Sequence, residues 1–181
     1  MKLFCTLALA LFASTQLHGQ AAPTATRTTI QAGGTFTFAA PDLLNQANTV
    51  NPYIEGYTIY ADVGFARRFS VEAEYHGLTV LTPRDFGENS LLAGPRYSFA
   101  LEDRANLYVK ALGGLGNIVY QAPSFAAHTE SHGVIAFGAG IEFRLTHHIN
   151  LRPIDVEYQH WLSYPAGLNP FVTSIGAAWV Y

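Results

Sequence analysis

The residues from Tyr53 to Leu81 alternate between two kinds of side chain, and this alternation restricts the possible folds more than any other feature. One set is apolar: Tyr57, Ile59, Ala61, Val63 and Phe65, then Phe69, Val71, Ala73 and Tyr75. The residues between them are small, polar or charged. A period of two indicates β-strands, and the charged break at Ala66, Arg67 and Arg68 predicts a tight reversal. The stretch therefore predicts a hairpin with one apolar and one polar face.

The same alternation recurs along the chain and predicts about eight strands. The further segments are Thr28–Phe38, Asn89–Phe99, Asn106–Leu115, His132–Arg144, Ile149–Trp161 and Phe171–Tyr181. The segment after Ile149 is the least regular, because Leu151 is out of phase with the apolar set that follows Pro153. Proline removes a ladder donor and a bulge resets the phase, so we expect a β-bulge near Pro153.

The connections between these segments alternate between long and short. The long ones are Ala39–Pro52, Thr82–Glu88, Val119–Glu130 and Leu162–Pro170, and short charged or polar turns fall between them. This order places all short turns at one end of the molecule and all long loops at the other, which is typical of outer-membrane barrels. The fold class we expect is an all-β, closed, antiparallel up-and-down transmembrane barrel, because strands in lipid cannot leave edge groups unpaired.

The N-terminus has the pattern of a secretory signal peptide. Lys2 supplies a positive n-region, Leu3–Ala13 an apolar stretch, and Gly19–Ala22 small residues for cleavage. We expect residues 1–22 to be removed and residues 23–181 to form one barrel domain. The single cysteine, Cys5, lies in the removed segment, so no disulfide or thiol chemistry is expected.

The low content of charged residues and the negative net charge exclude some classes of binding partner. Charged residues make up 13% of the chain, against about 25% in an ordinary soluble domain. After removal of the signal peptide nine Lys and Arg stand against 13 Asp and Glu, a net charge of −4. The sequence lacks the basic patch of a nucleic-acid-binding protein, so no nucleic acid is expected as a partner.

Two arrangements of the faces are compatible with alternation. A secreted, lipocalin-like ligand-binding barrel would turn its apolar face inward, around a cavity. A membrane barrel is favoured because aromatic residues of the apolar face gather beside the short turns, as an interfacial girdle would. These residues are Phe65, Phe69, Tyr97, Phe99, Phe143, Trp179 and Tyr181. Glycine is also frequent on the polar face, which fits a narrow interior and would only weaken a solvated strand.

Together these features resemble the small eight-stranded outer-membrane barrels: the OmpA-like transmembrane domain, OmpX and the opacity-like proteins. The ending Ile175, Ala177, Trp179 and Tyr181 resembles the C-terminal signal read by the barrel-assembly machinery. The resemblance implies the outer membrane of a Gram-negative-type bacterium, with short turns in the periplasm and long loops outside. It implies outer-membrane lipids, lipopolysaccharide and the assembly machinery as partners, and a monomer.

Charged side chains on the polar face are expected to form a network in the lumen. They are Glu72, Glu74, Arg96, Lys110, Glu142, Arg144, Asp155 and Glu157. Eight strands enclose only the width that side chains fill, so a plug of paired charges is favoured. The alternative is a narrow conducting pore or a salt-bridge gate.

The segment from His128 to His132, with Glu130 and Ser131 between them, suggests a metal site or a hydrolase pair. Some eight-stranded outer-membrane barrels are lipid A-modifying enzymes, but no strand segment here carries a matching His-x-Ser pattern. A solvated loop is therefore the favoured interpretation. We expect no catalytic residues, no cofactor and no metal ligands, and a non-enzymatic barrel with a structural or surface-interaction role.

Overall fold

The computed structural model describes residues 29–40, 54–78, 86–120, 128–164 and 167–181. The predicted signal peptide, residues 1–22, lies outside these ranges, as do the central parts of the predicted long loops. Within the described residues, no helix is long and apolar enough to cross a membrane.

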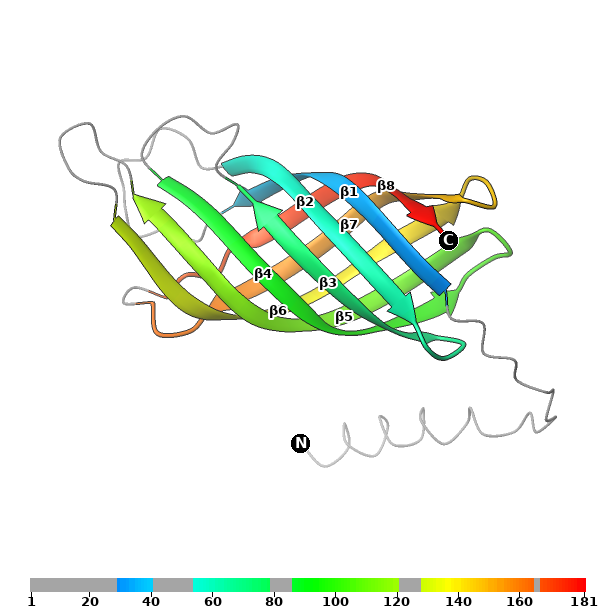
Figure 1. Ribbon diagram of the computed structural model, residues 1–181, viewed down its shortest axis with the longest axis horizontal. Helices are drawn as coiled ribbons and strands as arrows, with labels where there is room; N and C mark the ends of the chain where they lie inside the picture. The colour runs from blue at the N-terminus through cyan, green and yellow to red at the C-terminus, as the bar shows by residue number, and fades with distance from the viewer. Residues whose placement is uncertain (1–28, 41–53, 79–85, 121–127, 165–166) are drawn as a thin grey trace, which may run out of the picture.

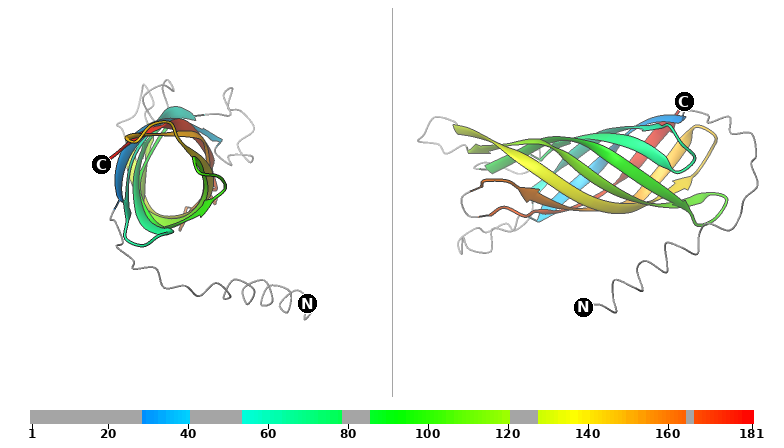
Figure 2. Two further views of the ribbon diagram at one scale, coloured as in Figure 1. Left: turned by 90° about the vertical axis from the view of Figure 1, so that its right-hand side faces the viewer. Right: turned by 90° about the horizontal axis from the view of Figure 1, so that it is seen from below.

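Eight strands follow one another along the chain and form a closed barrel in sequence order (Figures 1 and 2). They are β1 (Thr29–Ala40), β2 (Ile54–Gly64), β3 (Phe69–Gly77), β4 (Phe86–Ala100), β5 (Ala105–Tyr120), β6 (His128–Arg144), β7 (Ile149–Trp161) and β8 (Phe171–Val180). Every neighbouring pair is antiparallel, and β1 pairs with β8 from Gln31 opposite Val180 to Ala40 opposite Phe171. This pairing removes both sheet edges, as expected for an up-and-down barrel.

Alternate residues point into and out of the barrel, as the period of two predicts. In β3 the pattern is strict, with Ser70, Glu72 and Glu74 buried and Val71 and Ala73 exposed. The outward face carries large apolar side chains on every strand, with Leu115 67% and Phe137 61% exposed. The buried charged side chains of the strands lie inside and large apolar side chains cover the outside, which is the reverse of the lipocalin-like alternative.

The strands on the long-loop side are longer than predicted. The residues from Val119 to Glu130 were expected to form a loop, but β5 continues to Tyr120 and β6 begins at His128. Backbone pairing of Ile118 with Glu130 and of Val119 with Thr129 produces this extension. Pairing with an adjoining long strand overrides local sequence preference at these strand ends.

The bulge expected near Pro153 is confirmed. The register of β7 against β8 shifts between Arg152 and Asp155, and that of β6 against β7 shifts between Ile141 and Phe143. As a result Arg152 and Asp155, three residues apart, are both buried inside the barrel. An undisturbed strand would place residues three apart on opposite faces.

Candidate functional site

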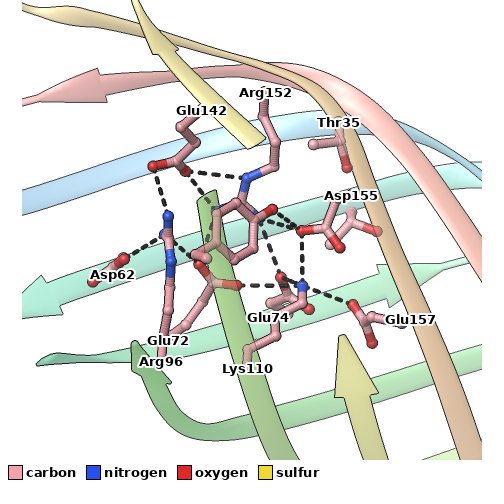
Figure 3. A network of polar contacts seen from close by, with 12 residues as sticks. Thr35, Asp62, Glu72, Glu74, Arg96, Lys110, Glu142, Arg152, Asp155 and Glu157 are labelled. Carbon is pink, nitrogen blue, oxygen red and sulfur yellow. Dashed lines mark hydrogen bonds and ion pairs between the residues drawn. The ribbon is translucent and has the colours of Figure 1, made fainter. Parts of the chain in front are cut away.

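Three cationic side chains from different strands converge inside the barrel. They are Arg96 of β4, Lys110 of β5 and Arg152 of β7, and none is more than 4% exposed. Buried carboxylates surround them: Asp62, Glu72, Glu74, Glu142, Asp155 and Glu157. Figure 3 shows these side chains pointing toward one another across the lumen. We call these nine residues the lumen network.

Arg96 binds the carboxylates of the part of the lumen nearest the short turns. One of its terminal nitrogens, Nη1, lies 2.5 Å from Asp62 and 2.9 Å from Glu72, and Nη2 lies 2.6 Å from Glu142. Its guanidinium plane also lies over the ring of Tyr108, 3.8 Å from the ring centroid. Hydrogen bonds between ionised groups in a buried site are among the stronger polar contacts in proteins.

Arg152 links the carboxylates that contact Arg96 to the carboxylates that contact Lys110. It lies 2.7 Å from Glu72 and 3.0 Å from both Glu142 and Asp155. Its guanidinium carbon is 3.6 Å from the centroid of the Tyr60 ring. The side chain therefore connects strands on opposite sides of the lumen, from β3 to β7.

Lys110 completes the lumen network. Its ammonium nitrogen lies 2.5 Å from Glu74, 2.9 Å from Asp155, 2.9 Å from Glu157 and 3.3 Å from Glu72. Asp155 also accepts a hydrogen bond from the hydroxyl of Tyr108.

The structure brings together seven of the eight residues predicted to form this network (Figure 3). Arg144 is the exception, and its prediction was wrong. It is the last residue of β6 and is exposed, beside a short turn where its backbone N–H donates to Arg104. The alternation does place it on the polar face, but the strand has reached the rim of the barrel there.

Sequence reasoning missed two charged members of the network. Asp62 belongs to the polar face of the first hairpin and could have been included on that ground. Arg152 could not be assigned from alternation alone, because the bulge that follows it breaks the phase of β7.

Toward the long loops the lumen is lined by apolar side chains. One cluster consists of Leu92, Leu112, Ile118, Val134, Ala136, Trp161 and Leu168. A smaller one consists of Ala39, Ile54, Leu78 and Val172. Several aromatic rings inside the barrel lie against glycines: an added Cβ at Gly116 would be 2.3 Å from Trp161, and one at Gly140 would be 2.3 Å from Tyr108.

We predict that Gly140→Ala lowers the free energy of unfolding by about 1–3 kcal/mol, the usual cost of overpacking. The added methyl group would displace the Tyr108 hydroxyl from Asp155 and disturb the lumen network. Gly34→Ala is the matched control, because its Cβ would meet no atom closer than 3.8 Å. Urea unfolding in detergent micelles measures both, and equal stability of the two variants would contradict the prediction.

The segment from His128 to His132 does not form the solvated loop that was favoured, since it lies in β6. Ser131 is exposed on the outer side and donates to Asn117 at 2.6 Å. His132 is half-buried on the opposite face, 3.6 Å from Glu130 and near the ring of Tyr164. Consecutive strand residues point to opposite faces, so Ser131 and His132 cannot act as a nucleophile and its base.

The aromatic residues expected to form the girdle lie at the short-turn end of the barrel and on its outer side. Six of them are exposed and Tyr97 is half-buried. Tyr97 packs edge-on against both Phe69 and Phe99, with ring centroids 4.7 Å apart in each pair. Trp179 stacks on His148 of the last short turn at 5.3 Å. All seven lie on the outer surface, and their contact with the membrane interface stays a prediction.

Comparisons with known proteins agree with this architecture. A family described as outer membrane protein beta-barrel domain matches residues 5–179. Among solved structures, the outer membrane protein OprG from Pseudomonas aeruginosa has a TM-score of 0.61 at 13% identity, over 85% of this chain and 96% of that one. Neisserial surface protein A has a TM-score of 0.57 at 15% identity, over 84% of this chain and 95% of that one. Ail, the attachment invasion locus protein of Yersinia pestis, has a TM-score of 0.54 at 18% identity, covering 85% and 97%. No curated protein matches the sequence at a significant level.

Proposed function

We propose, on the premise that the chain belongs to the outer membrane protein beta-barrel family, that it is a non-enzymatic structural or surface-interacting barrel with a lumen closed by its own side chains. Membership of this family places it in the outer membrane of a Gram-negative-type bacterium. The closed lumen, the orientation and the partners are our proposal.

The observation that carries the proposal is the lumen network. Arg96, Lys110 and Arg152 extend from three strands to carboxylates on other strands, so that ion pairs cross the barrel interior. An eight-stranded barrel has an interior just wide enough for side chains to fill. Opening a path for ions would require several buried pairs to separate at once, and each separation leaves a costly unpaired charge.

We expect the short turns to face the periplasm and the long loops to face outward, in contact with lipopolysaccharide or with surfaces outside the cell. The C-terminal strand is expected to engage the assembly machinery, and the barrel is expected to be a monomer. Labelling intact cells that carry Asp103→Cys with an impermeant maleimide tests the orientation. Asp103 lies in a short turn, so labelling before the outer membrane is permeabilised would contradict it.

A planar-bilayer measurement tests the closed lumen. The wild-type barrel, shown to be folded by its heat-dependent mobility on a gel, is expected to give no sustained conductance. Steady single-channel steps that change in size in a Glu72→Gln variant would instead support the second candidate, a narrow pore gated by ion pairs. Incubation with lipopolysaccharide separately tests the non-enzymatic role, and a change in lipid mass would overturn it.

A further inference from the structure

One group of buried residues on the long-loop side of Lys110 places an imidazole beside three carboxylates, and several of its polar atoms, like some others in the lumen, lack hydrogen-bond partners. Nε2 of His76, Oε2 of Glu74 and Oε2 of Glu157 have none among the described residues. Both carboxylate oxygens of Glu88 are also without one, although that side chain is 0% exposed. Burial of polar groups without partners is costly, so such a concentration calls for an explanation.

We propose that Glu74, His76 and Glu157, with Glu88 beside them, form a binding site for a divalent transition-metal ion of the zinc type inside the barrel. Sequence analysis predicted no metal ligands here. Glu74 and His76 lie on one strand, but Glu157 is far from them along the chain and only the closed barrel brings it to them.

The geometry of the first three residues suits such an ion. Each offers one ligand atom, and these atoms all lie within 4.8 Å of one another. Nε2 of His76 lies 3.4 Å from Oε2 of Glu74 and 3.7 Å from Oε1 of Glu157. Oε1 of Glu157 also lies 2.9 Å from Nζ of Lys110, whereas its Oε2 has no hydrogen-bond partner among the described residues. A tetrahedral zinc ion with bonds of about 2.0–2.2 Å holds neighbouring ligand atoms about 3.3–3.6 Å apart. Small side-chain movements would therefore bring the three atoms around one ion.

The imidazole of His76 is already oriented for this role. Its Nδ1 lies 2.8 Å from the hydroxyl of Thr58, which in turn lies 2.7 Å from the hydroxyl of Thr37. Histidines that bind a metal through one nitrogen usually donate a hydrogen bond through the other, which fixes the ring and its tautomer. The hydroxyl chain thus leaves Nε2 directed at the two carboxylates.

Glu88 provides the independent evidence for a ligand. It interacts electrostatically with both His76 and Glu157, and its backbone carbonyl accepts from Leu78 beside the end of β3. None of Arg96, Lys110 and Arg152 forms an ion pair with it. A bound cation would supply the missing partner, with Glu88 as a fourth ligand or as an acceptor for a ligand.

The charge balance of the lumen points in the same direction. Among the described residues, seven buried carboxylates face three buried Lys and Arg side chains, an excess of four negative charges while His76 is neutral. A divalent ion would offset two of them. The other close carboxylate group, Glu72, Glu74 and Asp155, shares Glu74 with this site and is paired with both Lys110 and Arg152. Neither cation pairs with Glu88, which therefore distinguishes the proposed site.

The test is titration of the refolded, chelator-treated barrel with Co²⁺, followed by displacement with Zn²⁺. We expect one Co²⁺ per barrel with the visible absorption of a tetrahedral site, at least tenfold weaker binding in Glu88→Gln and loss of that absorption in His76→Gln. The matched controls are His148→Gln and Glu102→Gln, two exposed turn residues of the same types, which should bind as the wild type does.

The outcomes separate this site from its alternatives. No stoichiometric binding by the folded wild type would overturn the proposal, and the excess charge would then be carried by protons on the carboxylates. Binding that survives Glu88→Gln and His76→Gln but is lost in His148→Gln would also overturn it, as metal held by surface histidines. If His76→Gln does not show the heat-dependent mobility of a folded barrel, Glu88→Gln decides, since its carboxylate makes no hydrogen bond to lose. Conductance is measured separately, so this inference and the closed lumen can fail independently.

Discussion

Arg152→Met is expected to lower the free energy of unfolding of the barrel by about 3–5 kcal/mol, the usual cost of removing one partner from a buried ionic network. Arg152 is the side chain through which the two halves of the lumen network meet, since it pairs with Glu72, Glu142 and Asp155. Methionine keeps much of its volume and removes its charge. The loss would therefore come from carboxylates left without a partner more than from a cavity.

Urea unfolding in detergent micelles, followed by tryptophan fluorescence, measures the effect. Arg144→Met is the matched control, because it also replaces an arginine by methionine, but at an exposed position. It should change the free energy of unfolding by less than about 0.5 kcal/mol. Adding Glu142→Gln to Arg152→Met should recover part of the loss, because it removes one stranded charge. Equal stability of Arg152→Met and Arg144→Met would mean that the ion pairs inside the barrel are not what stabilises it.

Arg152 also shows where prediction from the sequence ends. Alternation identifies the inward face of every regular strand, and this suffices to place Glu72, Arg96 and Lys110 in one lumen. Alternation fails at two positions. At Arg144 the strand has reached the rim of the barrel, and at Arg152 a bulge changes which residues face inward. Pro153 predicts that a bulge exists but not how many residues it displaces.

Contacts between strands on opposite sides of the barrel cannot be predicted from the alternation. Glu74 and Glu157 lie on β3 and β7, which are not neighbours, and their distance depends on the width and stagger of the closed sheet. Spacing along the chain carries no information about that distance. For this reason the hairpins and the inward face of each regular strand could be predicted, whereas the approach of Glu157 to Glu74 and His76 appears only in the folded barrel.

Ala73→Arg is expected to lower stability in a lipid bilayer by about 2–4 kcal/mol, the cost of an arginine at the bilayer midplane on a barrel's outer face. Ala73 is the central residue of the nine-residue strand β3, and its side chain points outward. Its partners across the sheet, Ala61 and Ala93, are also small and apolar. Among the described residues, the outward neighbours of Ala73 on β2, β3 and β4 are uncharged, so no carboxylate there can pair with the new charge. Four residues of β3 lie on either side of Ala73, so a guanidinium at this position cannot easily reach either interface.

Ala66→Arg is the matched control, because Ala66 is exposed in the short turn next to Arg67 and Arg68. Near the interface the same substitution costs about 0–1 kcal/mol. Reversible unfolding from lipid vesicles, compared with unfolding from detergent micelles, isolates the contribution of the bilayer, since the penalty at position 73 should be larger in vesicles. A variant as stable in vesicles as Ala66→Arg would mean that the apolar face of β3 does not contact lipid, and the membrane placement of this face would have to be abandoned.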